Sequence, residues 1–380
     1  MIKRISWIPA MISLSLIVGC VPSITNDTEV IQEIDSEVET TTIPNLQLSD
    51  QYYRTLLPYE KSASRGMIVS NVNSKYDVKE VENGLTRISQ RSYSPDKYFF
   101  QEGQMLDAEV ISSWLSRKSE EQPLGLNPSV KEGMTPEQRA TQAPMYLAHI
   151  LEQNYLVKTD DNKVKLAGVS IGLALNSIYY YQKIQYGPTF EEPIPESALL
   201  EQGKKMANEI VARMRTMEGL ENVPITIGLF KQESRNSIVP GTYMAFGNAP
   251  EGKGSIGEWK PINEEFILFP QPITEEKYRE MDNAFKNFKQ DIDEYFSNYT
   301  SVIATGFYQD DLAKKVTIDI PIQFYGSAEI IGFTQYMAGS VIKRFPDSIQ
   351  VEVSVTSING PEAFLIKKAG DKEPYVHIYD

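Results

Sequence analysis

Two stretches of this chain, KVKLAGVSIGLAL (163–175) and KVTIDIPIQFYGS (315–327), decide the fold because they share one pattern. Both alternate apolar with polar or small residues and are rich in β-branched side chains, which predicts a strand. Each is followed by an apolar stripe at helical spacing, in MANEIVARM (206–214) and MAGSVIKRF (337–345). The two regions therefore predict a strand and then a helix, twice.

The parallel continues beyond the helices. A proline-containing turn and a strand are expected in both regions, the strand in NVPITIGLF (222–230) and in DSIQVEVSV (347–355). Self-similarity over such a span predicts a duplicated unit. We expect an α+β fold of two similar repeats with mainly antiparallel strands, at residues 51–249 and 250–380. The glycine-rich run 247–257 is the natural junction.

Local patterns supply the other elements. Helices are predicted at Ala108–Lys118, Pro144–Tyr155, Pro195–Met217, Glu275–Tyr299 and Thr334–Phe345. Strands are predicted at 163–175, 177–185, 223–231, 241–247, 264–269, 302–309, 316–325, 348–358 and 363–368. Asp160-Asp161-Asn162 is typical of a turn, and Gly219 is expected to end the helix before it.

The first nineteen residues have the pattern of a signal peptide. Lys3 and Arg4 precede a mainly apolar run, Ile5 to Val18, that is too short to span a bilayer as a stable helix. The run ends Leu16-Ile17-Val18-Gly19-Cys20, which resembles a lipobox. Such a cysteine is alkylated by prolipoprotein diacylglyceryl transferase, and signal peptidase II cuts between Gly19 and Cys20. The alternative is an ordinary secretory signal with an accidental cysteine.

We favour lipidation because Cys20 is the only cysteine in the chain and stands where a lipobox needs it. Two acyl chains hold a protein stably on a membrane where one does not. The expected location is therefore the extracytoplasmic face of the cell membrane, with a diacylglyceryl anchor as the membrane contact.

Residues 20–50 read as an acidic, flexible tether. After Cys20 the segment has seven acids and no Lys or Arg. Like charges with few apolar residues favour an extended, solvated chain, here one that lifts the body off the surface. A frayed terminus with no spacer role would have the same composition.

Composition excludes several classes of function. A net charge of −14 argues against a nucleic-acid partner, since phosphate contacts need clustered Lys and Arg. One cysteine excludes a disulfide framework and a zinc site built on several thiolates. Only His149 and His377 are present, so a histidine-rich metal centre is excluded too, and we expect no metal and no cofactor.

Several segments together resemble the CamS family, the sex-pheromone-precursor lipoproteins of low-GC Gram-positive bacteria. They are the lipobox, the acidic segment, Gly125-Leu126-Asn127-Pro128 and the run from Tyr146 to Leu156, YLAHILEQNYL. The likeness covers nearly the whole chain, and the order of these short motifs carries more weight than any one of them. The resemblance implies a lipoprotein whose body has no established activity.

In that family the end of the signal peptide is trimmed and secreted as a peptide pheromone. The corresponding segment here is SLSLIVG: Ser13, Leu14, Ser15, Leu16, Ile17, Val18 and Gly19. The family's active peptide begins with Ala and ends with Ser, whereas this segment has Ser13 and Gly19 at its ends. That difference argues against activity at the same receptor.

A tyrosine-rich run offers a candidate ligand face. Tyr179, Tyr181 and Tyr186 could stack on a sugar or a peptide, because aromatic rings with polar tips suit both. Alternation along a strand places Tyr179 and Tyr181 on one face and Tyr180 on the other. Simple packing in the core is the competing explanation, and we favour it.

No catalytic pattern stands out. Acid pairs such as Glu264-Glu265 and Asp310-Asp311 could suggest glycosidase carboxylates, but we interpret them as solvated surface. His149, within a predicted helix, is expected to be partly buried and hydrogen-bonded, and His377 exposed. We expect a non-catalytic surface protein whose body binds an unidentified partner; the alternative is an envelope enzyme acting on wall polymer.

Overall fold

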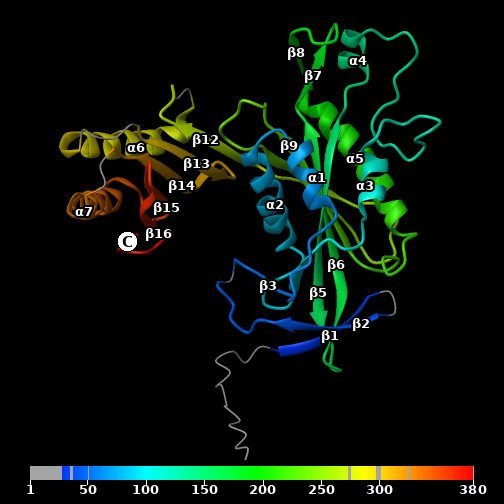
Figure 1. Cartoon of the computed structure of the whole chain (residues 1–380), viewed down its shortest axis with the longest axis horizontal. Helices are drawn as coiled ribbons and strands as arrows, with labels where there is room; N and C mark the ends of the chain where they lie inside the picture. The colour runs from blue at the N-terminus through cyan, green and yellow to red at the C-terminus, as the bar shows by residue number, and fades with distance from the viewer. Residues whose placement is uncertain are drawn as a thin grey trace, which may run out of the picture.

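The computed structural model describes residues 28–34, 37–49, 51–272, 275–296, 301–323 and 326–379, and this part of the chain has an α+β fold. Figure 1 shows two sheets side by side, each with its own helices. Most strand pairs are antiparallel, so the predicted fold class is confirmed. None of the described helices combines the length and the hydropathy needed to cross a membrane.

The first sheet has the strand order β11-β10-β9-β6-β5-β4-β3, with β1 paired to β6 and β2 to β1. Its strands are β1 Thr28–Ile34, β2 Glu37–Ile43, β3 Arg54–Thr55, β4 Phe99–Glu102, β5 Leu147–Lys158, β6 Lys163–Asn176, β9 Ile225–Gln232, β10 Thr242–Ala249 and β11 Trp259–Pro261. Its helices are α1 Ser64–Asn71, α2 Lys75–Ser89, α3 Ala108–Leu115, α4 Pro136–Gln142 and α5 Glu196–Met214. A separate hairpin joins β7 Ile178–Gln182 to β8 Thr189–Pro193.

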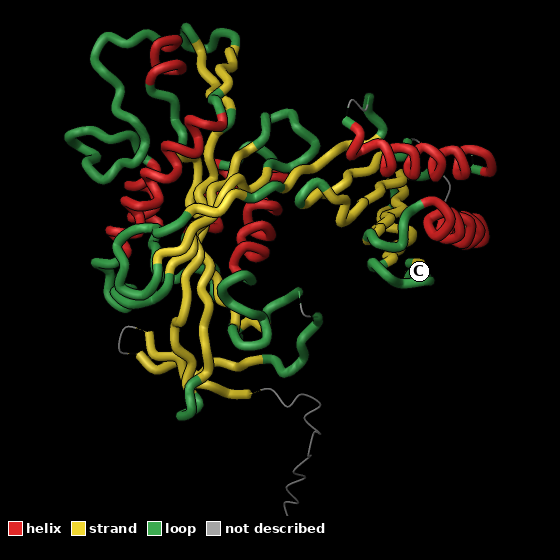
Figure 2. The backbone as a smooth tube through the Cα atoms, turned by 180° about the vertical axis from the view of Figure 1, so that it is seen from behind, coloured by secondary structure: helices red, strands yellow, loops and turns green. Residues whose placement is uncertain are grey.

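The second sheet has the order β12-β13-β14-β15-β16-β17. Its elements are β12 Glu264–Phe269, α6 Glu276–Tyr295, β13 Ile303–Gln309, β14 Leu312–Pro321, α7 Ser327–Arg344, β15 Gln350–Ser357, β16 Gly360–Lys367 and β17 Tyr375–Ile378. Both α6 and α7 pack on one face of this sheet through a single apolar core. Figure 2 shows the two helices on the side of the sheet away from the first sheet.

The two sheets share a connectivity. In the first, β5 and β6 are antiparallel, α5 follows, and β9 pairs parallel with β6 before the antiparallel β10. In the second, β13 and β14, then α7, then β15 and β16 repeat these relations. The duplication of one ancestral unit, with repeats at 51–249 and 250–380, stays a prediction. Strand β11, at 259–261, lies beyond residue 249, where the first predicted repeat ends, but it pairs with the first sheet.

One predicted helix is wrong: residues 147–158 form β5, in the middle of the first sheet. Apolar residues at helical spacing predict a helix at Pro144–Tyr155 instead. Helices cover both faces of this sheet, so successive residues of β5 such as Ile150 and Leu151 are both buried. A strand that is buried on both faces does not alternate, and its pattern can imitate a helix.

Part of the predicted tether is also structured. Residues 28–34 and 37–43 form an antiparallel hairpin, and β1 pairs with β6, so the expected extended chain does not hold there. The hairpin buries Val30 and Ile43 against Leu56, Phe99 and Leu156. The segment is rich in Val, Ile and Thr, whose branched side chains suit strands, and this preference outweighs the run of acids.

Helix α2 packs on the first sheet around one tyrosine. The ring of Tyr243 lies against Gly228 of the sheet and Gly84 of α2, and its hydroxyl lies against Gly172; a Cβ atom at any of the three would come within 2.6–2.8 Å of this tyrosine. The Tyr243 hydroxyl donates to the Val81 carbonyl at 2.8 Å. Glycine is therefore needed at these positions because the helix and the sheet enclose a large ring between them.

Candidate functional site

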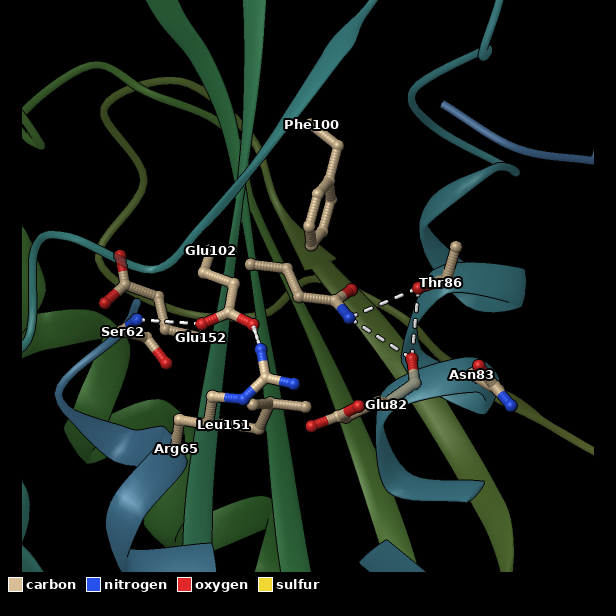
Figure 3. Close-up of a pocket in the computed structure, with 10 residues that line it drawn as sticks. Ser62, Arg65, Glu82, Asn83, Thr86, Phe100, Glu102, Leu151 and Glu152 are labelled. Atoms are coloured by element: carbon tan, nitrogen blue, oxygen red, sulfur yellow. Dashed lines mark hydrogen bonds and ion pairs between the residues drawn. The ribbon is translucent and has the colours of Figure 1, made fainter. Parts of the chain in front are cut away.

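A small pocket of about 200 Å³ opens where the helices α1 and α2 meet the strands β4 and β5 of the first sheet. Residues before and in α1 contribute Ser62 and Arg65, and α2 contributes Glu82, Asn83 and Thr86. The neighbouring strands β4 and β5 supply the remaining wall, with Phe100, Glu102, Leu151, Glu152 and Gln153. Figure 3 shows Glu102 and Glu152 on one side of this pocket and α2 on the other. The pocket therefore depends on the long-range pairing of β4 with β5.

Glu102 is fully engaged by neighbouring donors. Its Oε1 accepts from the hydroxyl of Tyr59 and from Nη1 of Arg65, and its Oε2 accepts from the Ser62 backbone N–H at 2.8 Å. Burial, together with the hydrogen bond to Glu102, raises the pKa of Tyr59 to about 12. The Glu102 carboxylate thus fastens the segment before α1 to β4.

Glu152 is buried and is held by backbone amides. Met105 N–H donates to both carboxyl oxygens at 3.0 and 3.2 Å, and Leu106 N–H donates to Oε2 at 2.9 Å. Burial raises the pKa of Glu152 to about 7, against these amides, which lower it. A Cβ on Gly103 would lie 2.3 Å from that of Glu152, so only glycine fits there. This carboxyl group anchors the loop after β4 on β5.

Two side chains in the pocket remain free for a ligand. Within the described residues, the Glu82 carboxylate and the Asn83 amide have no hydrogen bond or ion pair. Burial raises the pKa of Glu82, and the Arg65 guanidinium opposes that shift. The neighbouring Gln153 amide instead donates to the Glu82 carbonyl and the Thr86 hydroxyl, each at 3.2 Å. The pocket offers one carboxylate and one amide on α2.

The predicted tyrosine face is partly assembled. Tyr179 and Tyr181 of β7 are stacked with ring centres 6.4 Å apart, so the predicted alternation is confirmed for this pair. Tyr179 packs against the apolar core of the first sheet, and its hydroxyl accepts from Nη2 of Arg117 at 3.4 Å. Tyr186 is 91% exposed in the turn that follows. A hollow of about 330 Å³ is lined by Tyr179 and by Tyr180, whose ring lies 3.9 Å from the Arg235 guanidinium. Ligand binding by this face stays a prediction.

Comparison with known proteins places this chain in a family. The family model described as CamS sex pheromone cAM373 precursor matches residues 59–373. This chain belongs to the CamS family. A comparison with curated protein sequences finds no match.

Two solved CamS structures resemble this chain over most of its length. A sex pheromone precursor from Lactobacillus salivarius subsp. salivarius UCC118 is 32% identical, with a TM-score of 0.82 over 88% of this chain and 98% of that one. The C-terminal domain of the sex pheromone staph-cAM373 precursor from Staphylococcus aureus is 34% identical. Its TM-score is 0.72, over 82% of this chain and 98% of that one. The family resemblance predicted from sequence is confirmed.

The predicted lipidation residues of this CamS chain lie outside the described residues. They are Gly19 and Cys20, at the predicted cleavage site. The predicted pheromone segment, Ser13 to Gly19, also lies outside the described residues. The histidines are both described. His149 lies on β5, is fully buried, and neither ring nitrogen has a hydrogen-bond partner there, so the expected hydrogen bonding is wrong. His377 on β17 is exposed, as predicted.

Sequence reasoning missed the pocket carboxylates of this CamS body. One signal was available: Glu152, Gln153 and Asn154 are three successive polar residues inside an otherwise apolar run, and all three are buried. Buried polar side chains must find partners, so such a run indicates an internal polar network. Glu264, interpreted as solvated surface, is also buried, with its side chain 5% exposed beside Arg87. Among the described residues, no group of three His, Cys, Asp or Glu side chains could hold a metal ion.

Proposed function

We propose that this chain is a lipid-anchored protein of the extracytoplasmic face, and that its body binds a partner or an envelope ligand without catalysis. Membership of a family of pheromone precursors supports an exported protein. The residues Leu16 to Cys20 support the anchor, since the chain's only cysteine follows a signal-like apolar run and a small residue. A diacylglyceryl transferase and signal peptidase II are the expected maturation partners.

The state of the pocket carboxylates carries the non-catalytic part of the proposal. A hydrolase of the glycosidase type needs two carboxyl groups that reach the substrate. Glu102 and Glu152 both line the pocket, but every carboxyl oxygen of the pair already accepts a hydrogen bond from the protein. Among the described carboxylates of the pocket only Glu82 is free, and one carboxylate does not make such a pair. This arrangement supports binding over wall-polymer hydrolysis.

Replacement of the cysteine tests the anchor. Cys20→Ala removes the thiol that takes the lipid, so the chain should remain an unlipidated precursor or be shed into the medium. Cells grown with labelled palmitate and then fractionated provide the measurement. Ser23→Ala, three residues away, is the matched control and should label as the parent does. Equal labelling of Cys20→Ala would overturn the proposal.

The signal peptide is a proposed source of a second product. Trimming after cleavage would release SLSLIVG, residues 13–19, as a short apolar peptide. Synthetic SLSLIVG applied to responder cells that carry a pheromone-inducible plasmid tests this. Clumping supports the proposal, and silence at micromolar dose ends it.

A further inference from the structure

The second sheet has a covered face and an open face. Alternate residues of β13, β14 and β15 are buried against α6 and α7, while the residues between them stay half-exposed. Strand register places Phe266 opposite Phe307 and Phe307 opposite Lys315 on this second face. The first sheet, by contrast, carries helices on both faces. The open face therefore presents aromatic and polar side chains without a helical cover.

A cleft of about 750 Å³ lies where the open face meets α2 and the segment 51–55. It adjoins the smaller pocket of Figure 3, because Asn83, Thr86 and Phe100 line both hollows. We refer to these two adjoining hollows, which lie between β5, α2 and the second sheet, as the groove. A groove of this size and form suits an elongated ligand.

Most charged groups of this groove are paired or hydrogen-bonded within the described part of the chain, and the two that are not, Glu82 and Lys314, have opposite charges. Lys315 pairs with Glu352 at 3.0 Å, and Arg87 is bound by Glu80 and by Glu264 at 2.8 Å. Of the cations lining the larger cleft, only Lys314 lacks an ion pair within the described part of the chain. The whole chain also has a net charge of −14. A polyanion finds little free positive charge here, so the groove favours an uncharged ligand.

Aromatic rings and free amides remain for that ligand. The Phe307 ring already carries the Arg87 guanidinium, 4.9 Å from its centre, and packs 5.0 Å from the Phe266 ring. The rings left for a ligand are therefore Phe266 and Tyr52, which is 59% exposed at the edge of the cleft. Within the described residues, the side-chain amides of Gln51 and Asn83 have no hydrogen-bond partner. Sugar rings stack their apolar C–H faces on aromatic rings and bond their hydroxyl groups to amides. This combination is the chemistry that the groove offers.

We propose that the groove binds a linear, uncharged glycan chain. The inference rests on the proposed function, since it names the ligand of an outward-facing binding protein. Phe266, backed by the Phe307 ring, forms the stacking platform, and Asn83, shared by both hollows, bonds hydroxyl groups of the chain as it passes α2.

Calorimetric titration of the purified full-length chain in detergent tests the proposal. The probes are linear oligomers of N-acetylglucosamine and of glucose, with poly(glycerol phosphate) as the polyanion and a short alanine peptide as the peptide arm. At least one neutral oligomer should bind, and Phe266→Ala should weaken it about tenfold, as loss of a central aromatic anchor does.

Asn83→Ala is the second variant, because this exposed residue can be changed without disturbing the fold. It should also weaken binding, whereas Tyr186→Ala, the matched change of an exposed aromatic ring on the hairpin, should not. The proposal is overturned if no neutral oligomer binds at millimolar concentration, or if only the polyanion or the peptide binds. The groove would also be rejected as the binding site if Tyr186→Ala abolished binding while Phe266→Ala and Asn83→Ala left it unchanged.

This test is independent of the anchor. A chain that incorporates palmitate but ignores every neutral oligomer contradicts the groove and leaves the anchored protein standing. A chain that binds glycan but carries no lipid contradicts the anchor and leaves the groove standing.

Discussion

Arg87 of α2 lies 2.8 Å from the Glu264 carboxylate of β12, so an ion pair joins a helix of the first sheet to the first strand of the second. Glu80, seven residues earlier on α2, binds the same guanidinium. The Gln309 side-chain amide donates to the Glu264 carboxylate at 3.1 Å. Both carboxylates are nearly buried. Only Ile262 and Asn263 separate β11 from β12, and the Ile262 N–H donates to Met244 at 2.9 Å. The two sheets are thus held together by a short connection and by one shared arginine.

Removal of this arginine should destabilise the chain. Arg87→Met leaves Glu80 and Glu264 buried without their cation, and breaking a buried pair in this way costs about 3 kcal/mol. Urea unfolding measures the change in the free energy of unfolding. Lys205→Met is the control, because Lys205 and its partner Glu201 are both more than 60% exposed and such pairs contribute little. Equal effects of the two changes would contradict the role of Arg87.

Glu152 should make stability fall as the pH rises. Its pKa is raised to about 7 by burial, so the folded chain holds a proton that the unfolded chain releases near pH 4.5. The stability lost as the pH increases through this window amounts to about 3 kcal/mol. Glu152→Gln cannot titrate and should lack this loss. Urea unfolding at about pH 5 and about pH 8 checks it, and a constant difference between parent and variant would refute the expectation.

His149 should act in the opposite direction. Burial lowers its pKa from 6.5 to about 4, so the folded chain excludes a proton that the unfolded chain binds. Stability is therefore lost as the pH falls from about 6.5 towards 4. His149→Leu removes this loss and also removes two buried nitrogens without partners, so it should be at least as stable at neutral pH. A variant that is as acid-sensitive as the parent would count against this.

The contact between α2 and the first sheet should not tolerate a side chain. Gly228→Ala places a Cβ 2.6 Å from the Tyr243 ring and should cost about 1–3 kcal/mol in the free energy of unfolding. Gly254→Ala is the matched control, since nothing lies within 4 Å of its Cβ position. Thermal unfolding of both variants is the measurement. A Gly228→Ala midpoint equal to that of Gly254→Ala would mean that the ring moves aside freely.

Much of the fold follows from local pattern. The helices α5 and α6 are predicted within four residues, because each has one buried face and one exposed face, and the strands around them are placed about as well. The third helix, α7, begins at Ser327, seven residues before its predicted start at Thr334. β5 is the exception, since burial on both faces removes the alternation that identifies a strand. β1 and β2 are missed for another reason: their charge indicates solvation, and only the pairing of β1 with β6 and of β2 with β1 reveals the apolar side.

The pocket could not be predicted in the same way. Ser62, Arg65, Glu102 and Glu152 come together because β4 pairs with β5 and α1 packs beside them, and no local pattern encodes that pairing. The partners Arg87 and Glu264 are 177 residues apart. The polar run 152–154 indicates an internal hydrogen-bond network, but the sequence does not show which residues supply the hydrogen-bond partners. The tyrosine pair of β7, by contrast, is local and was predictable from alternation alone.

Mass spectrometry of the mature N-terminal peptide tests the central claim most directly. The account predicts a chain that begins at Cys20 and carries the added mass of a thioether-linked diacylglyceryl group. A free thiol at Cys20, or a mature chain that begins at any other residue, would contradict the account.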